Sequence, residues 1–106
     1  MGEIIAFQES NVPFITLEEM VKKAHELAKN SEDVYWDAPH VQQRMKERQV
    51  TIRQILHVLR EGKGIDGPTL DKYGDWRIKM KLFSAGRTVQ VVLVVREDHL
   101  EIITVI

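Results

Sequence analysis

The chain has 106 residues, a formal net charge of −1 and no cysteine. This length suits one domain and leaves no room for a second domain with its own core, so we expect a single domain over residues 1–106. Without cysteine the sequence excludes a disulfide framework, a thiolate metal site and a cysteine nucleophile. Hydrophobic residues make up 43% and charged residues 29%, values that argue against a wholly disordered chain.

No apolar run approaches the roughly 20 residues needed to cross a bilayer, so we expect no contact with a membrane. Residues 1–14 lack the basic start of a signal peptide and contain Glu3 and Glu9. Together with the absence of cysteine, these features predict a cytoplasmic location.

The charges divide unevenly along the chain. Residues 1–38 carry three basic and eight acidic residues, whereas residues 39–106 carry twelve basic and eight acidic ones. This asymmetry predicts two surfaces of opposite sign. The two surfaces could attract each other within the fold, or the basic one could bind phosphates.

An arm over residues 1–14 precedes the first clear helix. Thr16 and Glu19 have the spacing of a capping box, and apolar residues follow at helical spacing from Leu17 to Ala28. We expect this acidic amphipathic helix, residues 16–29, to complete the core. The alternative is that it covers the basic surface as a built-in antagonist. The arm and the helix together occupy residues 1–34.

A second helix is expected from Asp37, which can cap it, to Arg48, with Pro39 tolerated in its first turn. Three side chains at intervals of four residues share one stripe of this helix: His40, Arg44 and Arg48. Thr51 and Gln54 form another capping box and predict a third helix. Gly62 is expected to end it in the left-handed conformation.

The glycine-rich segment 62–67 has the pattern G-x-G-x-x-G. A dinucleotide site needs this pattern between a strand and a helix, whereas here it follows a helix. We therefore assign segment 62–67 to a helix end and a turn.

The hydrophobic period then changes to two, which is typical of strands. Residues 76–83 alternate, so that Arg77, Lys79 and Lys81 share one face. Segments 88–95 and 100–106 predict two further strands. Helices followed by an antiparallel meander predict an α+β fold, in which the N-terminal helices pack on one face of a sheet of three or four antiparallel strands.

The stripe on the second helix carries chemistry suited to phosphodiesters. An imidazole transfers protons near neutral pH, and a guanidinium forms paired hydrogen bonds with phosphate. The structural alternative is that the arginines pair with acidic neighbours while His40 caps its helix, and that the strand cations form a solvated face. The four histidines lack the spacing of metal ligands, so we predict no metal and no cofactor.

Four segments in sequence order carry a resemblance. Residues 40–48 read H-x-x-x-R-M-x-x-R, and the others are Asp75–Ile78, Gly86–Val92 and Ile102–Ile106. From about Tyr35 to Ile106 the chain resembles a family of small bacterial domains of unassigned function that is often grouped with the RelE- and BrnT-like toxins. Residues 37–39, Asp-Ala-Pro, depart from the small residues that members often carry around the histidine.

The resemblance implies a toxin-like core over residues 35–106 with the RelE/barnase-like fold. Many proteins of that broad group are ribonucleases held by an antitoxin. The shared helix motif falls on His40, Arg44 and Arg48, and the strand motifs fall on Arg77, Arg87 and Thr104.

Two functional hypotheses follow. In the first, the protein is a metal-independent endoribonuclease or RNA-binding toxin, with RNA and an antitoxin as partners. Its catalytic residues would be His40 and Arg44, its phosphate-binding residues would be Arg48, Arg77, Lys79 and Arg87, and Thr104 is a further candidate. In the second, it is a non-enzymatic protein-interaction module or an inactive toxin relative. Strand 100–106 would then be an exposed edge that pairs with another chain, including a second copy.

Overall fold

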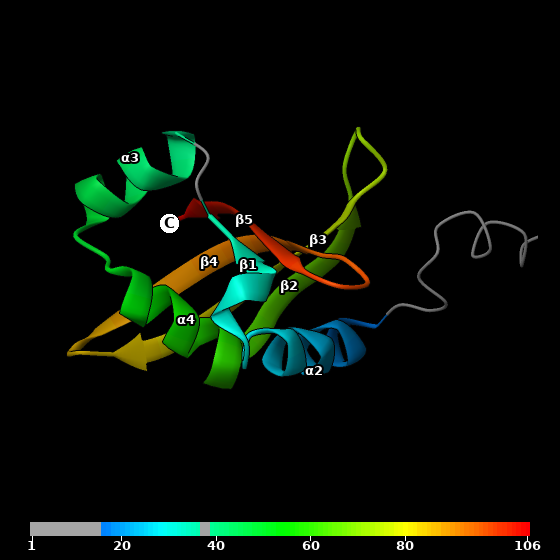
Figure 1. The fold of residues 1–106 in the computed structure, drawn as a ribbon, viewed down its shortest axis with the longest axis horizontal. Coiled ribbons are helices and arrows are strands. Elements are labelled where there is room, and N and C mark those ends of the chain that lie inside the picture. The colour runs from blue at the N-terminus through cyan, green and yellow to red at the C-terminus, as the bar shows by residue number, and fades with distance from the viewer. Residues whose placement is uncertain (1–15, 37–38) are drawn as a thin grey trace, which may run out of the picture.

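The structure, a computed structural model, describes residues 16–36 and 39–106. Its elements in chain order are α2 (Leu17–Leu27), the short 3-10 helix η1 (Ser31–Asp33), β1 (Val34–Tyr35), α3 (Pro39–Arg48), α4 (Ile52–Glu61), β2 (Lys63–Leu70), β3 (Trp76–Ser84), β4 (Arg87–Val95) and β5 (Leu100–Val105) (Figure 1). The expected arm and the Asp37 cap lie outside the described residues. No helix in the described ranges is long and apolar enough to span a membrane.

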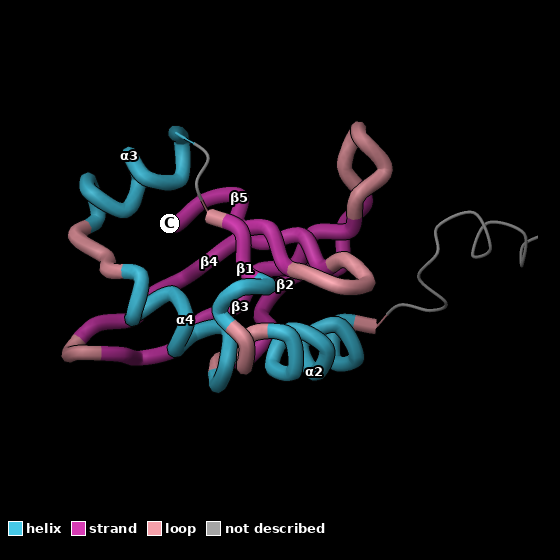
Figure 2. Tube along the Cα trace, in the orientation of Figure 1, coloured by secondary structure: helices cyan, strands magenta, loops and turns pink. Residues whose placement is uncertain are grey.

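The strands form one sheet in the order β1-β5-β4-β3-β2 (Figure 2). The predicted α+β fold is confirmed, with helices preceding the sheet. Two details differ from the prediction: over the described residues the sheet has five strands and not three or four, and it is mixed, because β1 runs parallel to β5. With only two residues, β1 is too short to show an alternating pattern in the sequence.

The strand β2 occupies the segment that the glycine pattern assigned to a turn. It contains Gly64, Gly67 and Pro68, and these residue types are depleted from strands. The segment still forms a strand because it lies at the edge of the described sheet, where β3 is its one partner. Its register shifts on both sides of Asp66, and such irregular edges tolerate proline.

The core lies between the sheet and the two helices α2 and α4. Buried side chains of these helices meet alternate residues of β3 and β4 in one cluster, which includes Met20, Ala24, Ile55, Val58, Leu59, Ile78, Met80, Val89, Val91 and Leu93. The amphipathic patterns therefore predicted both helices correctly, and α2 contributes to the core.

The opposite side of the sheet is called the open face below. The pairing of β3 with β4 has no register shift, so alternate residues keep to one side along both strands. On β3 the open face carries Arg77, Lys79, Lys81 and Phe83, and their partners on β4 are Val94, Val92, Gln90 and Thr88. The core-forming face carries the intervening residues, so the helices α2 and α4 pack away from the open face.

Local signals decide where the helices begin and end. The Thr16 hydroxyl accepts a hydrogen bond from the Glu19 amide at 3.0 Å, and Thr51 with Gln54 forms a complete capping box. Gly62 ends α4 as predicted, but in an extended conformation with φ −75° and not in the left-handed one. Its lack of a side chain serves packing, because a Cβ there would lie 2.5 Å from the Val58 carbonyl oxygen.

Candidate functional site

Helix α3 lies beside the C-terminal end of β5, apart from α2 and α4 (Figure 1). Its Val41 side chain is buried in the core cluster. The Arg44 Nε atom donates a hydrogen bond to the Val105 carbonyl at 3.2 Å, and its Nη1 atom lies 3.5 Å from the Glu47 carboxylate. These contacts tie the middle of α3 to the last residues of the sheet.

His40 lies in the first turn of α3 and is exposed. Its Nε2 atom lies 3.2 Å from the Thr104 hydroxyl oxygen. Thr104 is in register with Val92, and Val92 is in register with Lys79. Because residues in register project from the same side of a sheet, His40 contacts a side chain of the open face.

A shallow hollow lies further along this row of the open face. Its volume is about 210 Å³, and it is lined by Asp66, Gly67, Thr69, Arg77, Ile78, Lys79 and Val92. The hollow lies where β2 shifts its register against β3. About 10 Å, or two strand spacings, separate the backbones of Thr104 and Lys79, with Val92 between them.

The cations of the open face differ in what they contact. Arg77 donates from Nε to the Asp71 carboxylate at 2.9 Å, so it is paired within the fold. The pKa of Asp71 is lowered, mainly by the hydrogen bond from the backbone amide of Asp75. Hydrogen bonds from the Tyr73 amide and the Arg77 side chain act in the same direction. Within residues 16–36 and 39–106, neither Lys79 nor Lys81 has a carboxylate at ion-pair distance. Within that part of the chain, no ion pair holds either ammonium away from an external anion, although Asp66 of β2 is in register with Lys79.

A family model described as a domain of unknown function (DUF4258) matches residues 38–106, well over half of the chain. The chain belongs to the DUF4258 family. The matched residues contain α3, α4 and the strands β2 to β5, whereas α2 and β1 precede them. Comparison with curated proteins and with solved structures gives no match.

Two further arginines among the predicted phosphate-binding residues lie elsewhere. Arg87 is in register with the buried Ser84, so it projects from the core-forming face. Its guanidinium donates to the backbone carbonyls of Arg48 and Gln49, where the chain leaves α3. The side chain of Arg48 is exposed at the end of that helix. The structure thus brings His40, Thr104 and Lys79 to one face, and it separates Arg87 from them.

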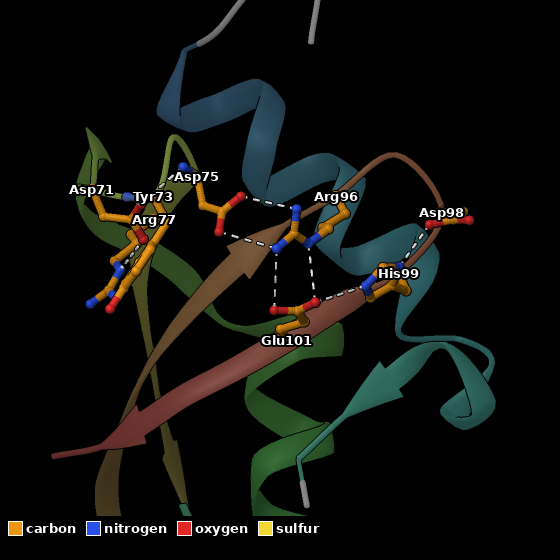
Figure 3. A network of polar contacts seen from close by, with 8 residues as sticks. All are labelled: Asp71, Tyr73, Asp75, Arg77, Arg96, Asp98, His99 and Glu101. Atoms are coloured by element: carbon orange, nitrogen blue, oxygen red, sulfur yellow. Dashed lines mark hydrogen bonds and ion pairs between the residues drawn. The ribbon is translucent and has the colours of Figure 1, made fainter. Parts of the chain in front are cut away.

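The DUF4258 sheet also carries a polar network that the sequence patterns did not indicate (Figure 3). Arg96 lies 2.9 Å from the Asp75 carboxylate and 3.1 Å from that of Glu101. The His99 ring bridges the carboxylates of Asp98 at 2.7 Å and Glu101 at 3.0 Å. This network joins the loop after β2 to the turn between β4 and β5.

The pKa shifts in this network have the sense expected of ion pairs. Hydrogen bonds to Asp98 and then Glu101 raise the pKa of His99, and the hydrogen bond to Glu101 raises that of Arg96. Burial raises the pKa of Glu101, but hydrogen bonds from His99 and Arg96 outweigh it, so the net direction is downward. The His99 ring also packs against the Tyr35 ring of β1, with the ring centroids 4.6 Å apart and the ring planes tilted by 31°.

These contacts assign the network a structural role, because each charge faces an opposite one. Within the described part of the chain, no group of three or more histidine or acidic side chains could hold a metal ion. The available sequence signal was the charged run from Arg96 to His99 directly after an apolar strand. Its partners Asp75 and Glu101 become apparent only once the strand register is known.

Proposed function

We propose that this DUF4258 protein binds RNA on the open face and cleaves it without a metal ion, with His40 transferring the proton. The observation that carries the proposal is the contact between His40 and Thr104, at the border of a face where, among the described residues, neither Lys79 nor Lys81 forms an ion pair. The sequence resemblance to RelE-like toxins supports the same chemistry.

The reaction would use the 2′-hydroxyl of the RNA itself. His40 accepts the proton of the 2′-hydroxyl while the 2′-oxygen attacks the adjacent phosphorus. The O2′–P bond forms as the P–O5′ bond breaks, which leaves a 2′,3′-cyclic phosphate, and the departing 5′ oxygen takes a proton from water. The Lys79 ammonium stabilises the negative charge that grows on the phosphoryl oxygens. The Thr104 hydroxyl orients the imidazole ring.

The other candidate residues take different parts in this proposal. The contacts of Arg44 with Val105 and Glu47 favour a positioning role, in which it holds α3 so that His40 reaches the open face. Arg48 is an exposed phosphate-binding candidate one turn further along the helix. Arg77 has a structural role, because it pairs with Asp71. Arg87 also has one, because it donates hydrogen bonds to the backbone carbonyls at the end of α3.

The test compares RNA cleavage by the wild type, His40→Ala and His57→Ala, with EDTA present throughout. His57 is a matched control, because it is an exposed histidine on α4 whose ring contacts Ser84 and Glu61 on the helix side. Removal of a general base typically lowers a rate by about 100-fold or more. We expect His40→Ala to lose cleavage by at least this factor, while His57→Ala retains it and the products carry cyclic phosphate ends.

Equal cleavage by His40→Ala and the wild type would overturn the catalytic assignment. If purified wild-type protein neither binds nor cleaves RNA, the non-enzymatic interaction module becomes the better account. An antitoxin that covers the open face is the partner expected under the ribonuclease proposal, and it should protect RNA from cleavage when added in excess.

A further inference from the structure

An aromatic ring projects into solvent from the open face. Phe83 has an exposed fraction of 68%, although burial of a phenyl ring from water is favourable. It follows Arg77, Lys79 and Lys81 along β3 on the same side of the sheet. Its partner in register, Thr88, is small and also exposed, so the strand pair provides no large neighbour to cover the ring.

Positive charge lies directly beside this ring. Successive open-face residues on β3 are about 7 Å apart, which places Lys81 next to Phe83 and Lys79 one step beyond. Lys63 of β2 is in register with Lys81. Both Lys79 and Lys81 are half-buried, as expected when the aliphatic stem lies along a sheet and the ammonium reaches water. Charge complementarity therefore favours a polyanion on this surface.

We propose that Phe83 stacks on an unpaired base, so that the open face selects single-stranded RNA. An unstacked base in a single strand offers its face to an aromatic side chain, whereas a base inside a duplex is covered by its neighbours on both sides. The phosphates that follow would contact Lys81 and Lys79, in the direction of His40 and Thr104. This inference rests on the proposed function and names its substrate class.

The experiment measures binding of a short fluorescent single-stranded RNA in the His40→Ala background, which keeps the RNA intact under the proposed mechanism. Adding Phe83→Ala should weaken binding roughly tenfold, because stacking contributes on that order for each base. Phe83→Trp, made instead of Phe83→Ala in the same background, should bind the single strand as the parent does. The matched control is Tyr73→Ala, which removes an aromatic ring of 73% exposure from the loop after β2 and should leave binding unchanged.

A duplex of the same sequence provides the second arm. The lysines still attract its phosphates, so it should bind, but Phe83→Ala should leave its affinity unchanged. The inference is overturned if Phe83→Ala binds the single strand as tightly as its parent. It is also overturned if Tyr73→Ala weakens single-strand binding as much as Phe83→Ala does, or if Phe83→Ala weakens duplex binding as much as single-strand binding. It is also overturned if Phe83→Leu binds like the parent, since an apolar contact would then suffice.

The readouts separate this inference from the proposed function. If binding depends on Phe83 but His40→Ala still cleaves at the wild-type rate, the stacking role stands and the catalytic proposal falls. If cleavage depends on His40 but Phe83→Ala changes neither binding nor cleavage, the catalytic proposal stands and the stacking role falls. A parent protein that does not bind single-stranded RNA overturns the stacking role together with the proposed RNA site.

Discussion

His99 retains its proton more firmly than an isolated histidine, because the carboxylates of Asp98 and Glu101 flank its ring. The Tyr35 ring packs against the same imidazole, so His99 also contacts the short strand β1. When it is protonated, His99 thus helps to hold β1, β4 and β5 together at one end of the sheet.

This arrangement predicts how stability depends on pH. The pKa of His99 is raised in the folded state above its ordinary value of 6.5. His99 therefore makes its full contribution to the free energy of unfolding at pH values below 6.5, as long as the carboxylates stay charged. This contribution is lost as the pH rises through the folded-state pKa of His99. We expect the stability difference between the wild type and His99→Gln to shrink between neutral and alkaline pH, as measured by urea unfolding.

A second variant checks the cause of this dependence. Asp98→Asn removes the first of the two hydrogen-bonded carboxylates, so the loss of stability at alkaline pH should become smaller than in the wild type. A difference between the wild type and His99→Gln that stays constant with pH would contradict the assignment.

The sequence could predict part of the candidate site at this scale. Alternation along residues 76–83 placed Lys79 and Lys81 on one face without any knowledge of the fold. It could not show that His40 meets that face, because this depends on how α3 packs against the end of β5. The sequence did not predict the Arg96 network for a similar reason, since the partners of Arg96, Asp75 and Glu101, come from separate parts of the chain.

Two glycines that follow α4 show how elements come close together. A Cβ at Gly62 would lie 2.5 Å from the Val58 carbonyl oxygen and 2.8 Å from that of Lys81, and both are backbone atoms. A Cβ at Gly64 would instead lie 2.7 to 2.8 Å from side-chain carbons of Val21 and Leu17 on α2. Side chains can adjust, whereas the backbone atoms near Gly62 belong to α4 and β3 and move only with those elements.

We therefore expect Gly62→Ala to destabilise the protein more than Gly64→Ala. Overpacking against side chains typically costs about 1–3 kcal/mol, which we expect for Gly64→Ala. Gly62→Ala should exceed that range, because a helix and a strand must move apart. Chemical unfolding of both variants beside the wild type gives the comparison, and equal losses would show that the backbone contacts at Gly62 relax freely.

The strands differ in how clearly their sequences indicate them. The strands β3, β4 and β5 were predicted from alternating or continuous apolar residues, because they form the interior of the sheet. The strand 100–106, predicted as an exposed edge that pairs with another chain, has neighbours at both ends, since β1 pairs with Leu100 and Glu101 and Arg44 bonds to Val105. Such neighbours come from distant parts of the chain and leave no local pattern. The pairing of this strand with another chain stays a prediction.

At the scale of the whole molecule, a net charge of −1 conceals a cationic side. The exposed acidic residues of α2 include Glu18, Glu19 and Glu26, and this helix packs on the face opposite Lys79 and Lys81. The unequal charges in the two parts of the sequence therefore correspond partly to two sides of the sheet.

This separation predicts a salt dependence for RNA binding by the His40→Ala protein. Each phosphate neutralised on a single strand contributes about −0.7 to the slope of log affinity against log salt. Contacts from Lys63, Lys79 and Lys81 would give a slope of about −2. Lys81→Ala should reduce its magnitude by about 0.7, whereas Lys22→Ala, on the exposed side of α2, should leave it unchanged. A slope insensitive to Lys81→Ala would place the RNA elsewhere.

The contacts that hold α3 in place also bear on the order in which the protein folds. His40 and Thr104 are 64 positions apart, and Arg44 and Val105 are 61 apart. Joining such distant segments costs chain entropy before any contact compensates for it, so these pairings form more slowly than the turns and hairpins. The hairpin of β3 and β4 needs no such closure. A refolding chain should therefore bury the core between α4 and the β3–β4 hairpin before His40 reaches the sheet. Under the proposed function, RNA cleavage should then recover later than compaction.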